Sequence, residues 1–140
     1  MKTTLWLFRL SLTVHAVCVL AQPILAGLYL DGSYDALGVH SLNGSILPAT
    51  GMVVGAAGLA FWIAGGAGWP LLAYGVLWLA EGFQIGMGYA RVLAVHLPLG
   101  VTIVALTIWL TVWSWLPRAS RRRRRRRESP RSALDRVEQS

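Results

Sequence analysis

Charged residues are nearly absent from most of this 140-residue chain. Between positions 10 and 117 only four residues carry a formal charge: Asp31, Asp35, Glu81 and Arg91. Charged residues make up 14% of the whole chain and hydrophobic residues 55%, whereas soluble domains carry about a quarter charged residues. This composition excludes an ordinary soluble enzyme and a disordered chain.

Cysteine is almost missing as well. Cys18 is the single cysteine and lies in an apolar run, so an internal disulfide is impossible and a disulfide scaffold is excluded. The sequence also lacks a nucleotide-binding loop and a nucleophile elbow. These absences leave a small integral membrane protein as the class that fits the composition.

Four apolar segments are long enough to cross a bilayer, which takes about 20 helical residues. They run over Leu5–Leu30, Leu42–Ala64, Pro70–Tyr89 and Val92–Leu116. Turn-forming residues separate or end them at 31–35, 65–68 and 86–88. Because short connections make neighbouring helices antiparallel, residues 1–117 are predicted to form an all-α, up-down four-helix transmembrane bundle.

The start of the chain also resembles a secretory signal peptide, with Lys2 and Arg9 before an apolar run and a small-residue site at 19–21. The apolar stretch resumes over 24–30, however, and its full length suits a membrane span. Lys2, Arg9 and the Arg118–Arg127 cluster then share one side. Since basic ends stay cytoplasmic, we expect a multi-pass protein of the cytoplasmic (inner) membrane with both termini in the cytoplasm.

Residues 118–140 form a hydrophilic, Arg-rich tail that is expected to be disordered. Its seven consecutive arginines, Arg121–Arg127, repel one another and are expected to be solvated or to lie on anionic lipid. Arginine runs also bind phosphates without specificity, but no aromatic residue or folded module accompanies this one. The predicted partners of the tail are therefore the bilayer and its anionic lipids, and no specific nucleic acid.

Two of the three histidines occur in matching contexts. The second span opens with Val-His-Ser-Leu-Asn-Gly at 39–44, and the fourth opens with Val-His-Leu-Pro-Leu-Gly at 95–100. The second and fourth helices of such a bundle run parallel and lie diagonally across its core, so His40 and His96 can project toward each other. Gly44 and Gly100 lie one turn deeper on the same helix faces and leave space for a flat ring.

A planar tetrapyrrole with two axial imidazoles needs this combination of residues. We therefore interpret His40 and His96 as ligands of a haem iron, with Gly44 and Gly100 beside the macrocycle. A zinc ion fits less well because it takes three or four ligands. The alternative for each histidine taken alone is an interfacial side chain with one wet edge.

This arrangement resembles the four-helix membrane b-type cytochromes, and most closely one half of haem A synthase, over residues 5–116. In that family a b-type haem lies near the outer face between histidines that His40 and His96 match. Gln-Pro-Ile-Leu-Ala-Gly at 22–27 is also similar to a signature that ends the first span of small bacterial four-span proteins. The family's glutamate before the first ligand has no match, since Leu-Gly-Val precedes His40. The resemblance thus implies one haem b without implying the family's hydroxylation activity.

Four further polar residues are candidates for supporting roles. Arg91 is expected to pair with a haem propionate or to reach the lipid headgroups. Glu81, which lies one turn from Gln84, is expected to accept a proton, to orient a ligand histidine, to pair with Arg91 or simply to reach outer-side water. His15 is expected about 22 Å deeper than the outer end of its span, as a buried histidine bonded to a neighbouring helix or a stop on an electron or proton route.

Two axial histidines would leave the iron no open position, which favours electron transfer over oxygen chemistry. The sequence therefore predicts a one-electron carrier, or a haem-bearing subunit of a respiratory or other redox complex, in preference to a complete enzyme. The alternative is a haem-free membrane scaffold or assembly factor that binds partner subunits and anionic lipid.

Overall fold

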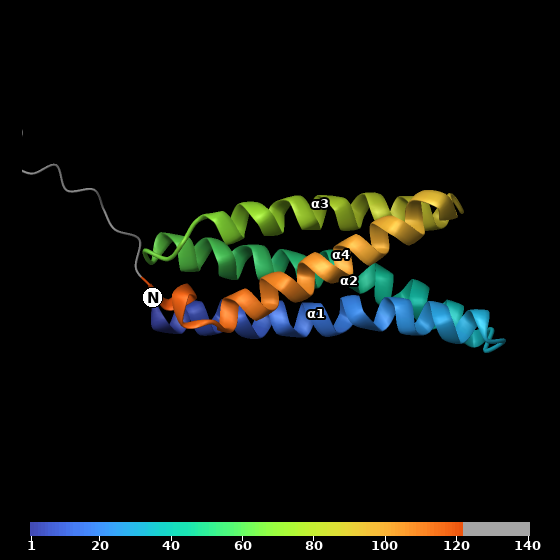
Figure 1. Cartoon of the computed structure of the whole chain (residues 1–140), viewed down its shortest axis with the longest axis horizontal. Helices are drawn as coiled ribbons and strands as arrows, with labels where there is room; N and C mark the ends of the chain where they lie inside the picture. Colours follow the sequence, from blue (N-terminus) through green and yellow to red (C-terminus); the bar gives the residue numbers. More distant parts are fainter. Residues whose placement is uncertain (122–140) are drawn as a thin grey trace, which may run out of the picture.

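The structure, a computed structural model, describes residues 1–121. Four long helices fill this range and are joined by short turns (Figure 1). They are α1 (Lys2–Leu30), α2 (Asp35–Ile63), α3 (Trp69–Tyr89) and α4 (Leu93–Trp115), followed by the short 3-10 helix η1 (Pro117–Ser120). The predicted all-α class is thereby confirmed. The expectations for the Arg-rich tail fall, from position 122 onward, outside the described residues.

α2 begins earlier than the sequence predicts, whereas α3 ends at Tyr89 as predicted. Asp35, expected in the first turn region, is the first residue of α2, where its carboxylate stabilises the positive end of the helix dipole. The turn before it is confined to 31–34 and uses Gly32 in the left-handed region, with φ of +98°. The expected loosening at 86–88 does not occur, since α3 stays helical to Tyr89.

Three of the four helices, α1, α2 and α4, are long and apolar enough to cross a membrane. The fourth predicted span, α3, is helical and about 30 Å long, but it is less apolar. Glu81, Gln84 and four glycines lie within its 21 residues and lower its mean hydropathy. α3 packs between α2 and α4.

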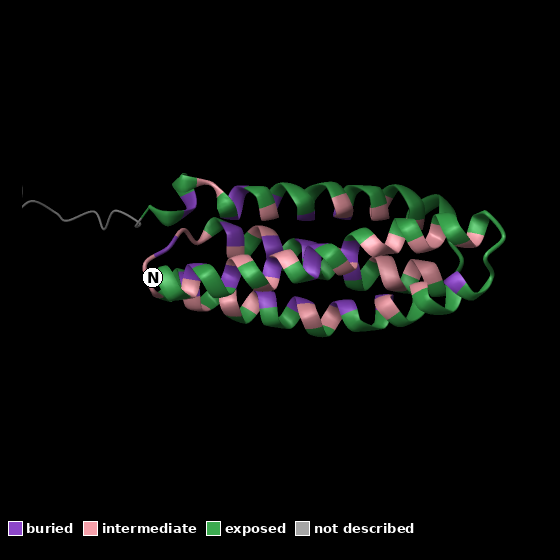
Figure 2. Ribbon diagram, turned by 90° about the horizontal axis from the view of Figure 1, so that it is seen from below, coloured by how far each residue is buried: buried purple, intermediate pink, exposed green. Residues whose placement is uncertain are grey.

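Exposed residues lie along the outside of the helices (Figure 2), and many of them carry large apolar side chains. On α1, for example, Val14, Val17 and Ile24 are 59%, 62% and 63% exposed. Soluble monomers rarely expose continuous apolar surface of this extent. Such a surface suits contact with lipid chains and supports a membrane protein.

Two apolar clusters fill the interior. The inner cluster lies nearer the Met1 end and comprises Leu5, Phe8, Leu12, Val54, Phe61, Tyr74, Leu77, Leu110, Trp113 and Ala119. The smaller outer cluster comprises Val19, Leu47 and Ile103. Within the inner cluster the rings of Phe8 and Phe61 stack with centroids 5.9 Å apart. The tightest packing of the bundle is therefore at this end.

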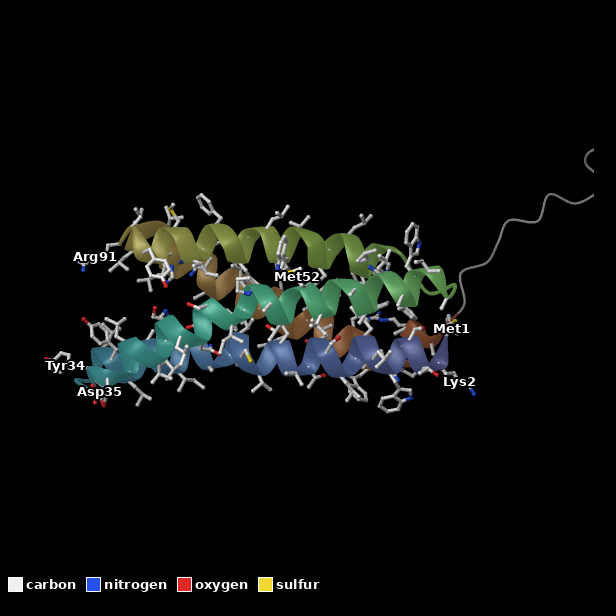
Figure 3. The ribbon with its side chains drawn as sticks, turned by 180° about the vertical axis from the view of Figure 1, so that it is seen from behind. Met1, Lys2, Tyr34, Asp35, Met52 and Arg91 are labelled. Carbon is white, nitrogen blue, oxygen red and sulfur yellow. The ribbon has the colours of Figure 1, made fainter. Side chains whose placement is uncertain are left out.

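The helices form two hairpins, α1–α2 and α3–α4, which diverge toward the end opposite Met1 (Figures 1 and 3). We call this the outer end; Tyr34, Asp35 and Arg91 lie there, with Met1 and Lys2 at the other end (Figure 3). At the inner end α4 meets α1, where Arg9 Nε donates to the carbonyl of Ser114 at 2.7 Å. At the outer end polar side chains connect the two hairpins.

Replacing Phe8 by Ala should destabilise the bundle, because Phe8 is fully buried against Phe61. We expect a loss of about 2 kcal/mol in the free energy of unfolding. This value is below the range for soluble cores, since lipid chains are as apolar as the protein interior. Unfolding in a denaturing detergent, followed by circular dichroism, measures it. Leu10→Ala is the control, because Leu10 on the same helix is 53% exposed. Equal losses in both variants would contradict the assigned packing.

Candidate functional site

His40 of α2 and His96 of α4 meet across the diagonal of the bundle. Their ring centroids are 6.3 Å apart and their planes are inclined by 67°. Both side chains are half-buried, near the end where the two hairpins diverge. The matching sequence contexts therefore correctly predicted that the two rings approach each other. Their role as ligands stays a prediction.

Each histidine is held by a glutamine of the helix that precedes it in its hairpin. In the α3–α4 hairpin, Nδ1 of His96 lies 3.0 Å from the backbone carbonyl oxygen of Gln84. In return the side-chain Nε2 of Gln84 donates to the backbone carbonyl of His96 at 2.7 Å. Because a carbonyl oxygen only accepts, Nδ1 of His96 carries the hydrogen and Nε2 keeps its lone pair.

The α1–α2 hairpin repeats this arrangement. Nδ1 of His40 lies 3.1 Å from the backbone carbonyl oxygen of Gln22. The Gln22 amide satisfies its neighbours when its oxygen and nitrogen exchange places. The nitrogen then donates to the His40 carbonyl at 3.2 Å, and the oxygen accepts from the Gly44 amide at 2.8 Å. The same nitrogen also lies 2.7 Å from His40 Nδ1. His40 therefore has two tautomers open to it, one of which matches His96.

Gly44 and Gly100 make room for these two glutamines. A Cβ atom on Gly44 would lie 3.1 Å from the Gln22 amide atom that faces it, and one on Gly100 would lie 2.8 Å from Nε2 of Gln84. The glycine surface expected to be bare is thus covered by side-chain amides. A macrocycle could lie against these glycines only if the glutamines turned aside. Sequence reasoning missed this use of Gln22 and Gln84, although each lies one helix before a Val-His-x-x-x-Gly segment.

The separation of the two histidine rings equals that of two imidazoles on opposite sides of one metal ion. A metal–nitrogen bond of about 2 Å on each side separates two imidazole centroids by about 6 Å, close to the distance between His40 and His96. Histidines that bind metals commonly donate their other ring nitrogen to a backbone carbonyl, as His96 does. A site built only from protein ligands is not supported, since residues 1–121 contain no group of three or more potential ligands.

Arg91 lies in the turn between α3 and α4 with φ of +57°. A residue other than glycine is uncommon in this left-handed region and costs about 1 kcal/mol there. This conformation ends α3 in a Schellman motif, in which the amide of Arg91 donates to the carbonyl of Gly88 and the amide of Val92 to the carbonyl of Met87. Within residues 1–121 the side chain of Arg91 makes no hydrogen bond or ion pair that would explain its presence, and it is exposed at the outer end (Figure 3). Its predicted pairing with a propionate stays a prediction.

Glu81 and His15 form a second polar site, deeper in the bundle. His15 Nε2 lies 3.0 Å from Glu81 Oε1, and the two side chains are 0% and 3% exposed. His15 Nδ1 lies 2.8 Å from Thr50 Oγ1. The expectation of a buried histidine bonded to neighbouring helices is confirmed. The expectations that Glu81 reaches outer water or pairs with Arg91 are wrong, because its carboxylate points into the core toward α1.

Comparison of the chain with protein-family models, with curated proteins and with solved structures finds no match. The function has therefore to be inferred from the residues and their geometry.

Replacing Gly100 by Ala should disturb the Gln84–His96 contact, because the new Cβ would meet the Gln84 amide nitrogen. Loss of one hydrogen bond predicts a decrease of about 1 kcal/mol in the free energy of unfolding. Gly86→Ala is the matched control, since a Cβ at that helical position has nothing within 4 Å. Thermal unfolding of both variants, followed by circular dichroism, measures the difference. A Gly100→Ala protein as stable as Gly86→Ala would contradict the contact.

Proposed function

We propose that this chain is a membrane haem-binding protein in which His40 and His96 are the two axial ligands of one b-type haem. Its task is one-electron transfer, alone or as a haem-bearing subunit of a redox complex. The observation that carries this proposal is the facing pair of imidazoles, 6.3 Å apart. Each has Nδ1 within hydrogen-bond distance of a glutamine backbone carbonyl.

These carbonyl contacts determine what the chain itself contributes. They fix the orientation of each ring and, when Nδ1 donates, leave Nε2 as the ligand atom. The side chains of Gln22 and Gln84 would adjust to the edge of the bound ring system. A haem iron with imidazole in both axial positions exchanges single electrons and keeps no open position for oxygen.

We place the site near the outer face of a cytoplasmic (inner) membrane. Lys2 and the helix η1, which contains Arg118, lie at the end of the bundle opposite Asp35 and Arg91, and basic residues favour the cytoplasmic side. Arg91 would then be available to a propionate, and the run Arg121–Arg127 would lie on anionic lipid of the inner leaflet. An electron donor or acceptor would approach the half-buried histidine pair from the outer end.

The absorption spectrum of the detergent-purified protein, oxidised and then reduced with dithionite, tests this function. After expression with ample haem we expect a sharp Soret band and split visible bands on reduction. His40→Ala and His96→Ala should each abolish this low-spin spectrum, because either change removes an axial ligand. His15→Ala should leave most of the pigment, since His15 bonds elsewhere.

Ser41→Ala is the matched control, because Ser41 follows His40 directly and its hydroxyl contacts only the exposed end of the bundle, at Tyr89 Oη. This variant should keep the wild-type spectrum. A colourless wild-type protein that also fails to take up added haemin would refute haem binding and favour a haem-free scaffold.

A further inference from the structure

A layer of polar residues crosses the middle of the bundle, with one member from each helix. We call it the polar layer: His15 of α1, Thr50 of α2, Glu81 of α3 and Thr107 of α4. His15 and Thr107 are 0% exposed and Glu81 is 3% exposed. On α1, α2 and α4 the residue of the polar layer has an inner-cluster residue one helical turn away on one side and an outer-cluster residue one turn away on the other. It therefore separates the two apolar clusters.

The hydrogen bonds within this layer determine how many protons the pair holds. The hydroxyl of Thr50 donates to the carbonyl of Leu47 at 3.0 Å, so its oxygen accepts from Nδ1 of His15. Nδ1 then carries a hydrogen. The 3.0 Å contact between His15 Nε2 and Glu81 Oε1 needs one more proton, which resides on either atom. With that proton the pair is neutral overall, whereas without it a single negative charge would be buried.

Two buried acceptors lead from this pair toward the outer end. Oε2 of Glu81 and Oε1 of Gln84 are both buried and have no hydrogen-bond partner among the described residues, as is also true of the hydroxyls of Thr107, within the layer, and of Tyr74, on its inner side. The two acceptors belong to residues one turn apart on the same face of α3. Buried acceptors of this kind require a donor, and a proton-carrying water between them would satisfy both. Gln84 continues the connection, because it bonds His96 in the half-buried outer site.

The opposite direction is closed by the inner cluster. Three of its members, Phe8, Leu12 and Leu110, are 0% exposed. Ser114, a buried polar residue farther along α4, has its hydroxyl engaged with the carbonyl of Thr111 at 2.7 Å. Tyr74, edge-on to His15 with centroids 5.6 Å apart, is the other titratable group at the layer; from α2 and α4 only threonine hydroxyls join it. No basic side chain faces the pair in the described chain.

We propose that the His15–Glu81 pair is a proton-binding site in the membrane interior that exchanges its proton with the outer side by way of water bound beside Gln84. Binding is reversible: one proton from outer water forms an N–H or O–H bond within the pair, and no electron is transferred. The inner cluster prevents exchange with the opposite side. This site is distinct from the histidine pair at the outer end, and its existence does not depend on haem.

Infrared difference spectroscopy of the full-length protein in bilayers tests the proposal. When the pH is changed between about 5 and about 9, we expect carboxyl and imidazole bands that report one proton bound or released by the pair. Glu81→Gln should abolish these bands. If that variant does not fold, wild type labelled with ¹³C-glutamate gives the assignment, since the other two glutamates, Glu128 and Glu138, follow the arginine run.

The rate of exchange in D₂O tests the route. Gln84→Leu should slow exchange at the pair by about tenfold or more, equivalent to about 1.4 kcal/mol in the barrier, because it removes the polar connection. Ser114→Ala, a buried polar change on the inner side, should exchange at the wild-type rate. Bands that neither titrate nor exchange would show a fixed structural contact and overturn the proposal. Slowing by Ser114→Ala alone would overturn outer access, and bands that respond to sodium instead of pH would show a cation site.

Discussion

The rest of this structure depends on one constraint: polar side chains inside a bilayer must find partners within the protein. His15 and Glu81 satisfy each other across the α1–α3 diagonal, while His40 and His96 face each other across the α2–α4 diagonal. Diagonal helices do not otherwise pack closely, since each helix contacts mainly its two neighbours around the ring. These two side-chain pairs therefore set the relative depth of the helices, which apolar packing alone would leave free to slide.

The two sites differ in how completely the protein surrounds them. The His15–Glu81 pair lies between two apolar clusters and is almost fully buried. The His40–His96 pair lies where the hairpins diverge, and it is connected to the backbone through Gln22 and Gln84. An open, half-buried site suits a ligand that enters from outside, whereas a closed one suits an occupant as small as a proton. The proposed functions follow this difference in enclosure.

Much of the outer site could be predicted from the sequence, because the repeated Val-His-x-x-x-Gly segments contain both the depth and the helix face of each histidine. The partners of Glu81 could not be predicted in this way. The depth of Glu81 was estimated from the outer end of its own helix, but the helices differ in length: α1 and α2 have 29 residues each, and α3 has 21. The α1–α2 hairpin therefore extends farther outward, and His15 lies closer to Glu81 than that depth implies. The sequence did contain one signal for the polar interior. His15 and Gln22 are seven residues apart, as are Asn43 and Thr50, so the two members of each pair lie on one face of their helix.

The helices also fix the depth between the two sites. His40 and Thr50 are ten residues apart on α2, and His96 and Thr107 are eleven residues apart on α4, which corresponds to about 15 Å along the helix axis. At this distance and an effective dielectric constant of about 20, two unit charges interact by about 1.1 kcal/mol. If the outer histidines hold a redox centre and the inner pair binds a proton, one added electron would favour protonation by about sixfold. Because the proton would enter from the outer side, the bundle would couple electron arrival to proton uptake on that side alone. The apolar residues between the layers, Val19, Leu47 and Ile103, keep the local dielectric low and so preserve this coupling.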